Sequence, residues 1–437
     1  MLTKHENVLE HSFPSKLFLE ATTRCNLRCP MCVKQSGGGI RSGDLSVAIF
    51  DRLKPALARL DEVIIGGIGE PLLHPLLEAF ICDMKTALPA SGSVGLQTNG
   101  TLLTDTRIES LLSVDVDTIC ISVDAATAKM LATIRTGARF DLLETALKRL
   151  NQTKHRASCS GPLVGIQCVV MRQNLSHLPQ VIQWAGRLGV DFAIVSHLLP
   201  FDAAMAQQVV YPSCSDAAIY LFRKWRQDMR RSGLHIENYL AASMKFYKSR
   251  SDAENRLVAM VEAMKAESSC NDITLNLAKL MNPPDTWMAS VHDVFEEALA
   301  IAQDLGLDLI LPSCQPDHVR QCSFIEEGSV FVNWDGKVSP CQFVRHPYTC
   351  YPDGREKVVR PVYFGDLQST PLQEIWDSAD FRHFRKNVLQ YDFPSCADCG
   401  FLPCDYIDGR TFEQDCHTNT IPCCDCPWST GILNCLQ

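Results

Sequence analysis

Three cysteines stand close together near the N-terminus, in the stretch "RCNLRCPMC". Cys25, Cys29 and Cys32 follow the spacing C-x3-C-x2-C, and thiols this close together cannot brace a domain as disulfides. A structural zinc site closes with four ligands, whereas three thiolates on one loop hold three irons of a cubane cluster and leave the fourth iron open. We therefore expect this loop to bind an iron–sulfur cluster with one iron open to a substrate or cofactor.

A second group of cysteines lies in the C-terminal part of the chain, where hydrophobic periodicity is weak. Such a segment buries too little apolar surface to fold alone, so we expect metal ligation to order it. Because C-x2-C pairs are also typical of zinc ligands, one or two structural zinc sites are the alternative. The group comprises Cys314, Cys322, Cys341, Cys350, Cys396, Cys399, Cys404, Cys416, Cys423, Cys424, Cys426 and Cys435.

The bulk composition is that of an ordinary globular protein of two or three domains, with 437 residues, 46% hydrophobic and 21% charged. The formal net charge of −9 argues against a nucleic-acid partner, since such surfaces are basic. The sequence has no secretory signal and no run of about 18 apolar residues, so we expect no membrane span. We therefore expect a cytoplasmic protein. Because the cytoplasm is reducing, the 21 cysteines indicate metal binding or catalysis rather than disulfides.

The cysteine loop follows the first of six apolar runs that alternate with helical patterns between about residues 17 and 200. This alternation predicts βαβ units and a parallel sheet covered by helices. Six strands indicate an open or closed α/β barrel, with ligands at the C-terminal strand ends. The runs are "LFLEATT", "EVIIGG", "VGLQTNG", "TICISVD", "LVGIQCVV" and "FAIVSHL", and helices are expected over 46–60, 75–88, 104–113, 139–153 and 176–188.

Glycines and polar residues stand at the ends of these predicted strands. Glycine lets a backbone approach a ligand closely, but a glycine-rich strand exit or an Asn-Gly turn is the plain structural alternative. Farther along, the pair Asp335-Gly336 predicts a hairpin. The strand-end residues are Gly66, Gly67, Gly69 and Glu70 in "GGIGEP", Asn99 in "QTNG", Ser122 and Asp124 in "ISVD", and His197 after the sixth strand.

In this order the motifs resemble the radical S-adenosylmethionine (SAM) superfamily, whose signature is C-x3-C-x2-C after the first strand of a partial (β/α)6 barrel. The resemblance implies that the three N-terminal cysteines bind a catalytic 4Fe–4S cluster and that "GGIGEP" meets the amino group of SAM. It implies that the other strand-end residues contact SAM or line the substrate cavity. Met31 stands where an aromatic residue often packs near the adenine, and a thioether fills that space.

The C-terminal cysteines resemble the SPASM domain, which carries two auxiliary 4Fe–4S clusters in some radical SAM enzymes. By resemblance, Cys314, Cys322 and Cys341 bind the first cluster with a later cysteine such as Cys416. Cys396, Cys399 and Cys404 then bind the second with one of the final cysteines, although the spacing departs from the usual C-x2-C-x5-C-x3-C. The tail resembles the C-terminal ending of maturases of tungsten-cofactor oxidoreductases. Cys416, Cys423, Cys426 and Cys435 match the cysteines of that ending, and Cys424 is an additional cysteine.

The resemblance divides the chain into a core barrel over 1–202, a helical insert over 203–313 and a SPASM-like domain over 314–437. It implies reductive cleavage of SAM to a 5′-deoxyadenosyl radical, with reduced ferredoxin or flavodoxin as electron donor. The substrate is expected to be a protein, a peptide or a cofactor, in the maturation of a tungsten-containing oxidoreductase. The alternatives are thioether or carbon–carbon crosslinking of a peptide, and a zinc-binding interaction protein that is not an enzyme.

Overall fold

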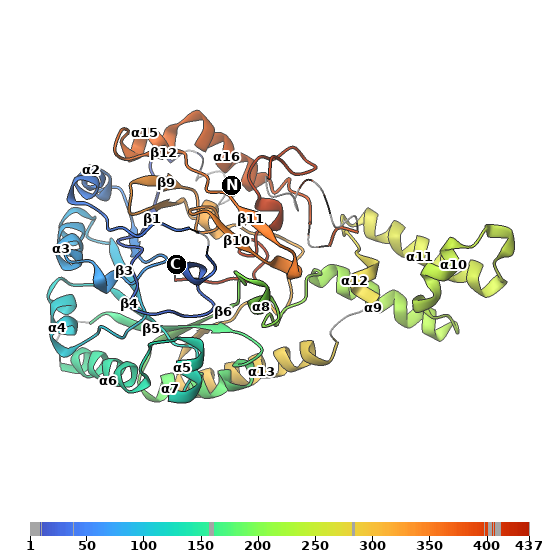
Figure 1. Cartoon of the computed structure of the whole chain (residues 1–437), viewed down its shortest axis with the longest axis horizontal. Helices are drawn as coiled ribbons and strands as arrows, with labels where there is room; N and C mark the ends of the chain where they lie inside the picture. The colour runs from blue at the N-terminus through green and yellow to red at the C-terminus, as the bar shows by residue number, and fades with distance from the viewer. Residues whose placement is uncertain are drawn as a thin grey trace.

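A computed structural model of the chain describes residues 9, 11–37, 39–156, 161–281, 285–396, 398–400, 404, 406 and 412–436. Its centre is a curved sheet whose first six strands pair in chain order, all parallel. This arrangement confirms the partial (β/α)6 barrel (Figure 1). The strands are β1 (Lys16–Leu19), β2 (Glu62–Ile65), β3 (Ser93–Thr98), β4 (Thr118–Ser122), β5 (Leu163–Val170) and β6 (Phe192–His197).

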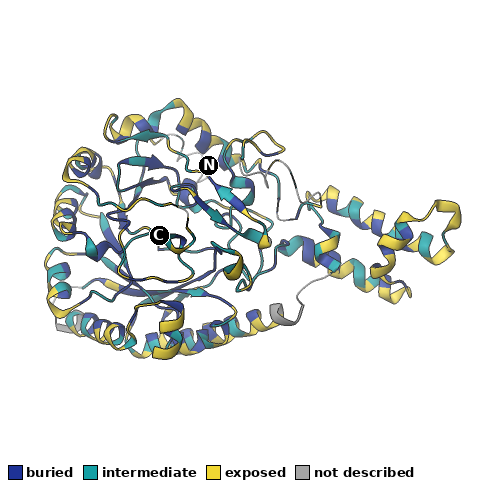
Figure 2. Ribbon diagram, in the orientation of Figure 1, coloured by how far each residue is buried: buried dark blue, intermediate teal, exposed yellow. Residues whose placement is uncertain are grey.

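Helices follow the strands and cover the outside of the sheet, with their apolar faces inward and their polar faces exposed (Figure 2). Three of them begin at a side-chain cap, because the first N–H groups of a helix have no partner within it. Ser46, Thr104 and Thr127 each accept the N–H of the residue three positions later. The helices are α2 (Val47–Leu57), α3 (Leu77–Ala87), α4 (Asp105–Ser113), α5 (Ala128–Ile134), α6 (Phe140–Arg156) and α7 (Leu178–Arg187).

The sheet continues beyond the six barrel strands at both edges. β7 (Asp308–Ile310) adds to β6, and β8 (Ser329–Val332) pairs in parallel with β1. The hairpin predicted at Asp335-Gly336 is confirmed, because β9 (Lys337–Ser339) pairs antiparallel with β8. The cysteine-rich C-terminal part is therefore joined to the barrel by backbone pairing as well as by side-chain packing.

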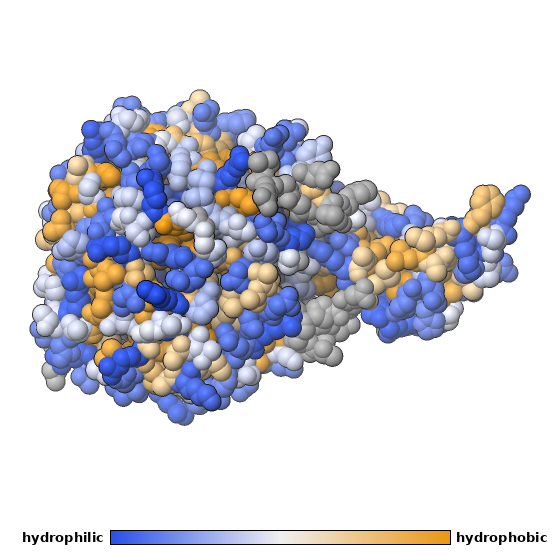
Figure 3. Space-filling model, in the orientation of Figure 1, coloured by the Kyte–Doolittle hydropathy of each residue, from blue (hydrophilic) through white to orange (hydrophobic). Residues whose placement is uncertain are grey.

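Helices between β6 and β7 form an arm that projects from the barrel (Figure 1). The arm has a small apolar core of its own, and hydrophobic side chains also reach its surface (Figure 3). α13 (Asp285–Leu305) leaves the arm and packs along α7, so the end of the predicted insert lies with the barrel. The arm helices are α9 (Asp216–Arg231), α10 (Tyr239–Met244), α11 (Asp252–Cys270) and α12 (Leu277–Met281).

The C-terminal part wraps over one side of the barrel and then returns to it. After β10 (Tyr348–Cys350), β11 (Lys357–Val359), β12 (Gly365–Asp366), α15 (Leu372–Asp377) and α16 (Ala379–Gln390), the tail enters the barrel (Figure 1). Leu436 packs there with Phe18, Ile64 and Ile194 from the barrel strands. No helix among the described residues is long and apolar enough to cross a membrane.

Candidate active site

A cavity of about 330 Å³ lies at the C-terminal ends of the barrel strands. The structure thus brings most of the predicted strand-end residues to one place, as expected where parallel strands end at the same edge. Of the predicted residues, Gly66 and Asp124 do not line the cavity. Those that line it are Cys25, Cys29, Met31, Cys32, Gly67, Gly69, Glu70, Asn99, Ser122 and His197.

The three N-terminal thiols share one wall of this cavity. The backbone N–H of Leu27 donates to the Cys25 sulfur at 3.4 Å, and the Asn99 amide lies 3.8 Å from the same sulfur. Burial raises the pKa of Cys29 to about 11 and also raises that of Cys32. Buried thiolates therefore need a positive partner, and bound iron would supply it.

The donor set suits an iron–sulfur cluster. Cys25, Cys29 and Cys32 lie on one wall of the cavity, and in a cubane each of three thiolates binds its own iron. N–H groups that point at a cluster thiolate stabilise it, as the Leu27 N–H does at Cys25.

The glycine-rich segment lies directly against the cysteine loop. A Cβ on Gly69 would stand 2.1 Å from the carbonyl oxygen of Thr22, so another residue cannot fit without moving the backbone. The next residue, Glu70, has its N–H 2.7 Å from the carbonyl oxygen of Arg24 and thereby ties the two segments together. Glycine is required here for a close approach between two chain segments, which also brings both to the cavity.

Glu70 braces this loop with its carboxylate. The side chain is buried and accepts hydrogen bonds from the Thr98 hydroxyl at 2.6 Å, the Asn99 N–H at 2.7 Å and the Leu72 N–H at 3.1 Å. Burial raises its pKa, while these three donors oppose the rise. The contacts therefore give Glu70 a structural role, bracing the loop, beside the contact with SAM that the resemblance implies.

Asp124 acts on the cavity through another side chain. The carboxylate is fully buried and pairs with Arg135 at 2.6 Å, while its other oxygen accepts the N–H of Val169. Arg135 lines the cavity beside Cys29, whose pKa its charge lowers. The sequence analysis missed Arg135, because it follows α5 and returns to the strand ends only in the folded chain. The sequence feature that could have indicated Arg135 is its position shortly after Asp124, which ends an apolar strand.

His197 is buried at the end of β6 as a neutral imidazole. Its Nε2 donates to the Ser313 carbonyl at 3.0 Å, and burial lowers its pKa to about 4. Within the described part of the chain, Nδ1 has no hydrogen-bond partner, so it presents a lone pair. Met31 packs nearby against Ile134, Met171 and Leu198, as a flexible apolar side chain should.

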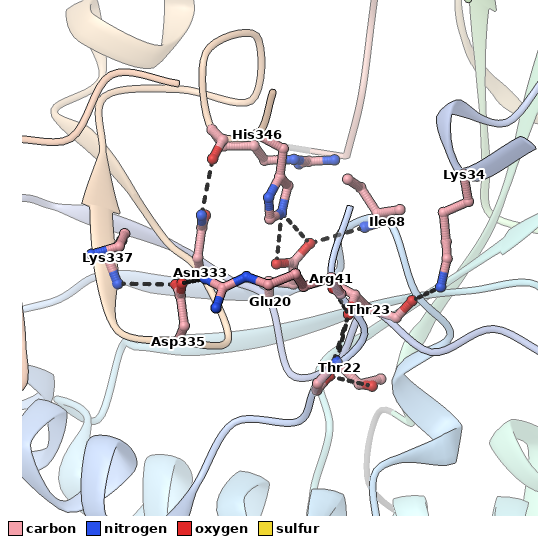
Figure 4. A network of polar contacts seen from close by, with 12 residues as sticks. Glu20, Thr22, Thr23, Lys34, Arg41, Ile68, Asn333, Asp335, Lys337 and His346 are labelled. Atoms are coloured by element: carbon pink, nitrogen blue, oxygen red, sulfur yellow. Dashed lines mark hydrogen bonds and ion pairs between the residues drawn. The ribbon is translucent and has the colours of Figure 1, made fainter. Parts of the chain in front are cut away.

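A second wall of the cavity comes from the C-terminal part of the chain. His346, in the loop after β9, places Nε2 at 2.8 and 3.1 Å from the carboxylate oxygens of Glu20, which follows β1 (Figure 4). Glu20 also accepts the N–H of Ile68 at 3.2 Å. Arg345 and Tyr348 line the same wall. The sequence analysis did not find this wall, because 326 residues separate Glu20 from His346.

Four cysteines line a separate apolar cavity beside α16. They are Cys322, Cys341, Cys423 and Cys426, and burial together with their mutual charge raises the pKa of each of the first three. The predicted partners Cys314 and Cys416 are not on this wall. Four thiols around one apolar cavity fit a fully thiolate-ligated cluster.

Other C-terminal cysteines lie in three further places. Cys396 contacts Cys424, and Cys416 lies near Cys399 and Cys404, since the charges of those thiols act on it. Cys435 instead lines the main cavity, on the tail that enters the barrel. Cys424, which is extra in the sequence motif, is therefore a buried neighbour of a predicted ligand.

Comparisons with known proteins define the class. The family model of the radical SAM superfamily matches residues 19–185, and that of the SPASM iron–sulfur cluster-binding domain matches residues 322–400. The chain belongs to the radical SAM superfamily and carries a C-terminal SPASM domain. It is a radical SAM enzyme, with SAM, a 4Fe–4S cluster and auxiliary iron–sulfur clusters as cofactors. This membership favours iron–sulfur ligation over the zinc alternative.

Particular relatives narrow the class. The chain is 28% identical over 96% of both chains to the tungsten-containing aldehyde ferredoxin oxidoreductase cofactor-modifying protein of Pyrococcus furiosus. It is 32% identical to the mycofactocin maturase MftC of Mycobacterium tuberculosis, over 41% of this chain and 44% of that one. The crystal structure of SuiB from Streptococcus suis shares the fold, with a TM-score of 0.51 at 14% identity over 91% of this chain and 73% of SuiB.

Proposed function

We propose that this enzyme performs a maturation step for a tungsten-containing oxidoreductase, acting on that protein or on its cofactor. The observation that carries the proposal is the likeness to the Pyrococcus furiosus cofactor-modifying protein over 96% of both chains. The arm lies outside both family matches, at residues 19–185 and 322–400. A likeness that also spans the arm is therefore more specific than membership of the superfamily.

The three N-terminal cysteines would hold the cluster that, when bound, supplies the electron for cleaving SAM to a 5′-deoxyadenosyl radical. The chain's own part is to bind and orient. Arg135, held by Asp124 beside Cys29, is a fixed cation that suits the carboxylate of SAM. Carbonyl groups of the "GGIGEP" segment accept from its ammonium, and the lone pair on His197 accepts from an N–H donor.

The C-terminal tail closes the cavity against water, which a reactive radical requires. Asn434 fixes the tail to the barrel, because its side-chain amide donates to the Val195 carbonyl at 3.0 Å and its N–H donates to the Ser196 hydroxyl. Trp428 and Leu433 then add apolar surface to the cavity wall. Reduced ferredoxin or flavodoxin is the proposed electron donor.

For the auxiliary clusters we propose two ligand sets. Cys322, Cys341, Cys423 and Cys426 bind one cluster, supported by the cavity that they share. Cys396, Cys399 and Cys404 bind the other, with Cys416 or Cys424 as the fourth ligand, supported by the proximities of these thiols. Cys314 and Cys435 are left outside both sets.

Iron analysis of anaerobically reconstituted protein tests the first set. The Cys426→Ala variant should lose about four irons per chain, whereas Cys314→Ala should keep the iron content of the wild type. An equal loss of iron in the two variants, or a loss of iron in Cys314→Ala alone, would contradict this ligand set and support the one expected from the sequence motif, which includes Cys314.

The second candidate function is modification of a peptide, supported by the SPASM domain over residues 322–400 and by the precursor peptide bound in a crystal structure of SuiB, which shares this fold. The two functions predict different products. The enzyme with SAM and dithionite should change the mass of the tungsten oxidoreductase or its extracted cofactor, while Cys29→Ala changes neither. A mass change confined to a small peptide encoded beside the enzyme would establish the second function instead.

A further inference from the structure

Arg345 places a positive charge on the cavity wall formed by the C-terminal part of the chain. Its guanidinium carbon lies 4.6 Å from the centre of the Phe331 ring, which supports the flat face of the side chain. The backbone is fixed as well, because its carbonyl accepts from the Asn333 amide at 2.9 Å and the Tyr363 hydroxyl at 3.0 Å. The guanidinium is therefore held in one place before any ligand arrives.

Among the described residues, no carboxylate forms an ion pair with this guanidinium. Its Nη1 atom is also buried without a hydrogen-bond acceptor in the described part of the chain. The nearby carboxylate of Glu20 is occupied by His346 and by the N–H of Ile68. Burial lowers the pKa of Arg345, which reflects the cost of holding this charge away from water. A half-buried guanidinium with a buried N–H that has no acceptor is costly unless something else pairs with it.

The chemistry of that missing partner follows from the donor. A guanidinium is a planar fork of N–H groups that stays charged at any working pH and matches carboxylate and phosphate oxygens. His346 is the next residue, and the side chain of Gln342 lines the same wall, so further polar groups flank the charge. An oxyanion in the cavity would pair with this guanidinium and neutralise its charge.

Arg345 and Arg135 stand at different parts of the cavity. The charge of Arg135 acts on Cys29 and Cys32, beside the N-terminal cluster, whereas the charges that act on Arg345 are those of Glu20 and of Tyr348, Cys435 and Cys341 from the C-terminal part. Arg135 is already paired with Asp124. A ligand held by Arg345 therefore lies toward the auxiliary cluster, where a substrate rather than SAM is expected.

We propose that Arg345 binds an oxyanion of the substrate, a carboxylate or a phosphate, and so selects an anionic substrate for this cavity. The inference rests on the proposed function, since it describes the substrate of that site. It deepens that function by stating which chemical group the substrate must carry, whether a phosphate of a cofactor or a carboxylate of a polypeptide.

Equilibrium binding tests this inference separately from any maturation reaction. The probes are inorganic phosphate and acetate, added to reconstituted protein saturated with SAM so that the SAM site is already filled. Wild type should bind one of them saturably, and the tighter anion identifies the group. Arg345→Met should weaken binding about tenfold or more, whereas Arg59→Met, which alters an exposed arginine outside the cavity, should not.

Iron content and thermal unfolding show whether each variant has folded, and Arg345→Gln replaces Arg345→Met if the latter does not. Unchanged binding in either folded variant overturns the inference, and so does the absence of saturable binding of both anions in wild type. Failure of the maturation assay leaves these outcomes unaffected, so the two proposals stand or fall separately.

Discussion

At the scale of single residues, the site contains buried polar groups that are held by close neighbours. Asp124 holds Arg135, Glu70 holds the end of β3, and His197 is tied to Ser313. Each of these groups is withdrawn from water, so its charge state depends on one or two neighbours rather than on solvent. Such groups position ligands accurately and make stability depend on pH.

His197 gives a measurable pH dependence. Its pKa is about 4 in the folded protein and about 6.5 when unfolded, so between these values the unfolded state binds the extra proton. The contribution of His197 to the free energy of unfolding is therefore fully present above about pH 6.5 and is lost as the pH falls toward 4. The loss is about 2 kcal/mol at pH 5. Denaturant unfolding of wild type and His197→Gln at pH 7 and pH 5 should show this difference.

The matched control for that experiment is His177→Gln, since His177 is half-buried and its Nδ1 lies 3.2 Å from the side-chain oxygen of Gln180 at the protein surface. It should leave the pH dependence of unfolding as in wild type. If His197→Gln loses as much stability as wild type between pH 7 and pH 5, His197 is not held neutral in the folded protein.

Part of the residue-level site could be predicted from the sequence. The cysteine triad, the glycine segment and the polar strand ends are local patterns, and the strand order brings them together. Arg135, Arg345, His346 and Glu20 could not be placed, because they meet through loops and through contacts hundreds of residues apart in sequence. The sequence assigned Asp124 to the cofactor because it ends a strand, whereas its carboxylate faces Arg135.

At the scale of elements, the site depends on the fit between the cysteine loop and the glycine segment after β2. Gly67 has φ of +147°, and a Cβ there would lie 2.8 Å from Glu20. Gly69 lies even closer to the backbone of the cysteine loop. Two loops at neighbouring strand ends are thus packed at backbone contact, which is how the cavity gains its shape.

The substitution Gly69→Ala tests this packing. Its Cβ would stand 2.1 Å from the Thr22 carbonyl oxygen, so one of the two loops must move. We expect the variant to lose about four irons per chain on reconstitution and most of its SAM cleavage. Gly95→Ala is the control, because its Cβ would meet ordinary contacts of 3.6 Å or more. Wild-type iron content and SAM cleavage in Gly69→Ala would contradict the close packing described here.

The elements themselves were predictable to different degrees. Apolar runs alternating with amphipathic helices indicate a parallel barrel, and the six strands form as expected. The pairing of β8 with β1 was not foreseen, because a short strand of four residues says nothing about which edge it joins. α13 illustrates the same limit, since its apolar face fits the arm or the barrel equally well in sequence but packs on α7.

At the scale of the whole molecule, the C-terminal part and the barrel form one structure around the cavity. Backbone pairing of β8 with β1, the contact of His346 with Glu20 and the entry of the tail into the barrel all join them. The domain boundaries at residues 202 and 313 stay a prediction. β7 pairs with β6 and α13 packs on α7, so both of these elements lie with the barrel. The projecting arm is the part with a core of its own.

The tail should therefore contribute to global stability. Leu436 is 7% exposed and packs among Phe18, Ile64 and Ile194, so Leu436→Ala should lower the free energy of unfolding by about 2–4 kcal/mol. Leu240→Ala, on the exposed surface of the arm, should change it by less than about 0.5 kcal/mol. Denaturant midpoints compare the variants, and equal midpoints would mean that the tail does not pack inside the barrel.

The central claim is that Cys25, Cys29 and Cys32 bind a cluster that cleaves SAM. The most direct measurement is 5′-deoxyadenosine formed from SAM and dithionite by anaerobically reconstituted protein. Wild type and Cys82→Ala, which alters an exposed thiol, should form it at similar rates, and Cys29→Ala should form none. Formation of 5′-deoxyadenosine by Cys29→Ala at the wild-type rate would contradict the account.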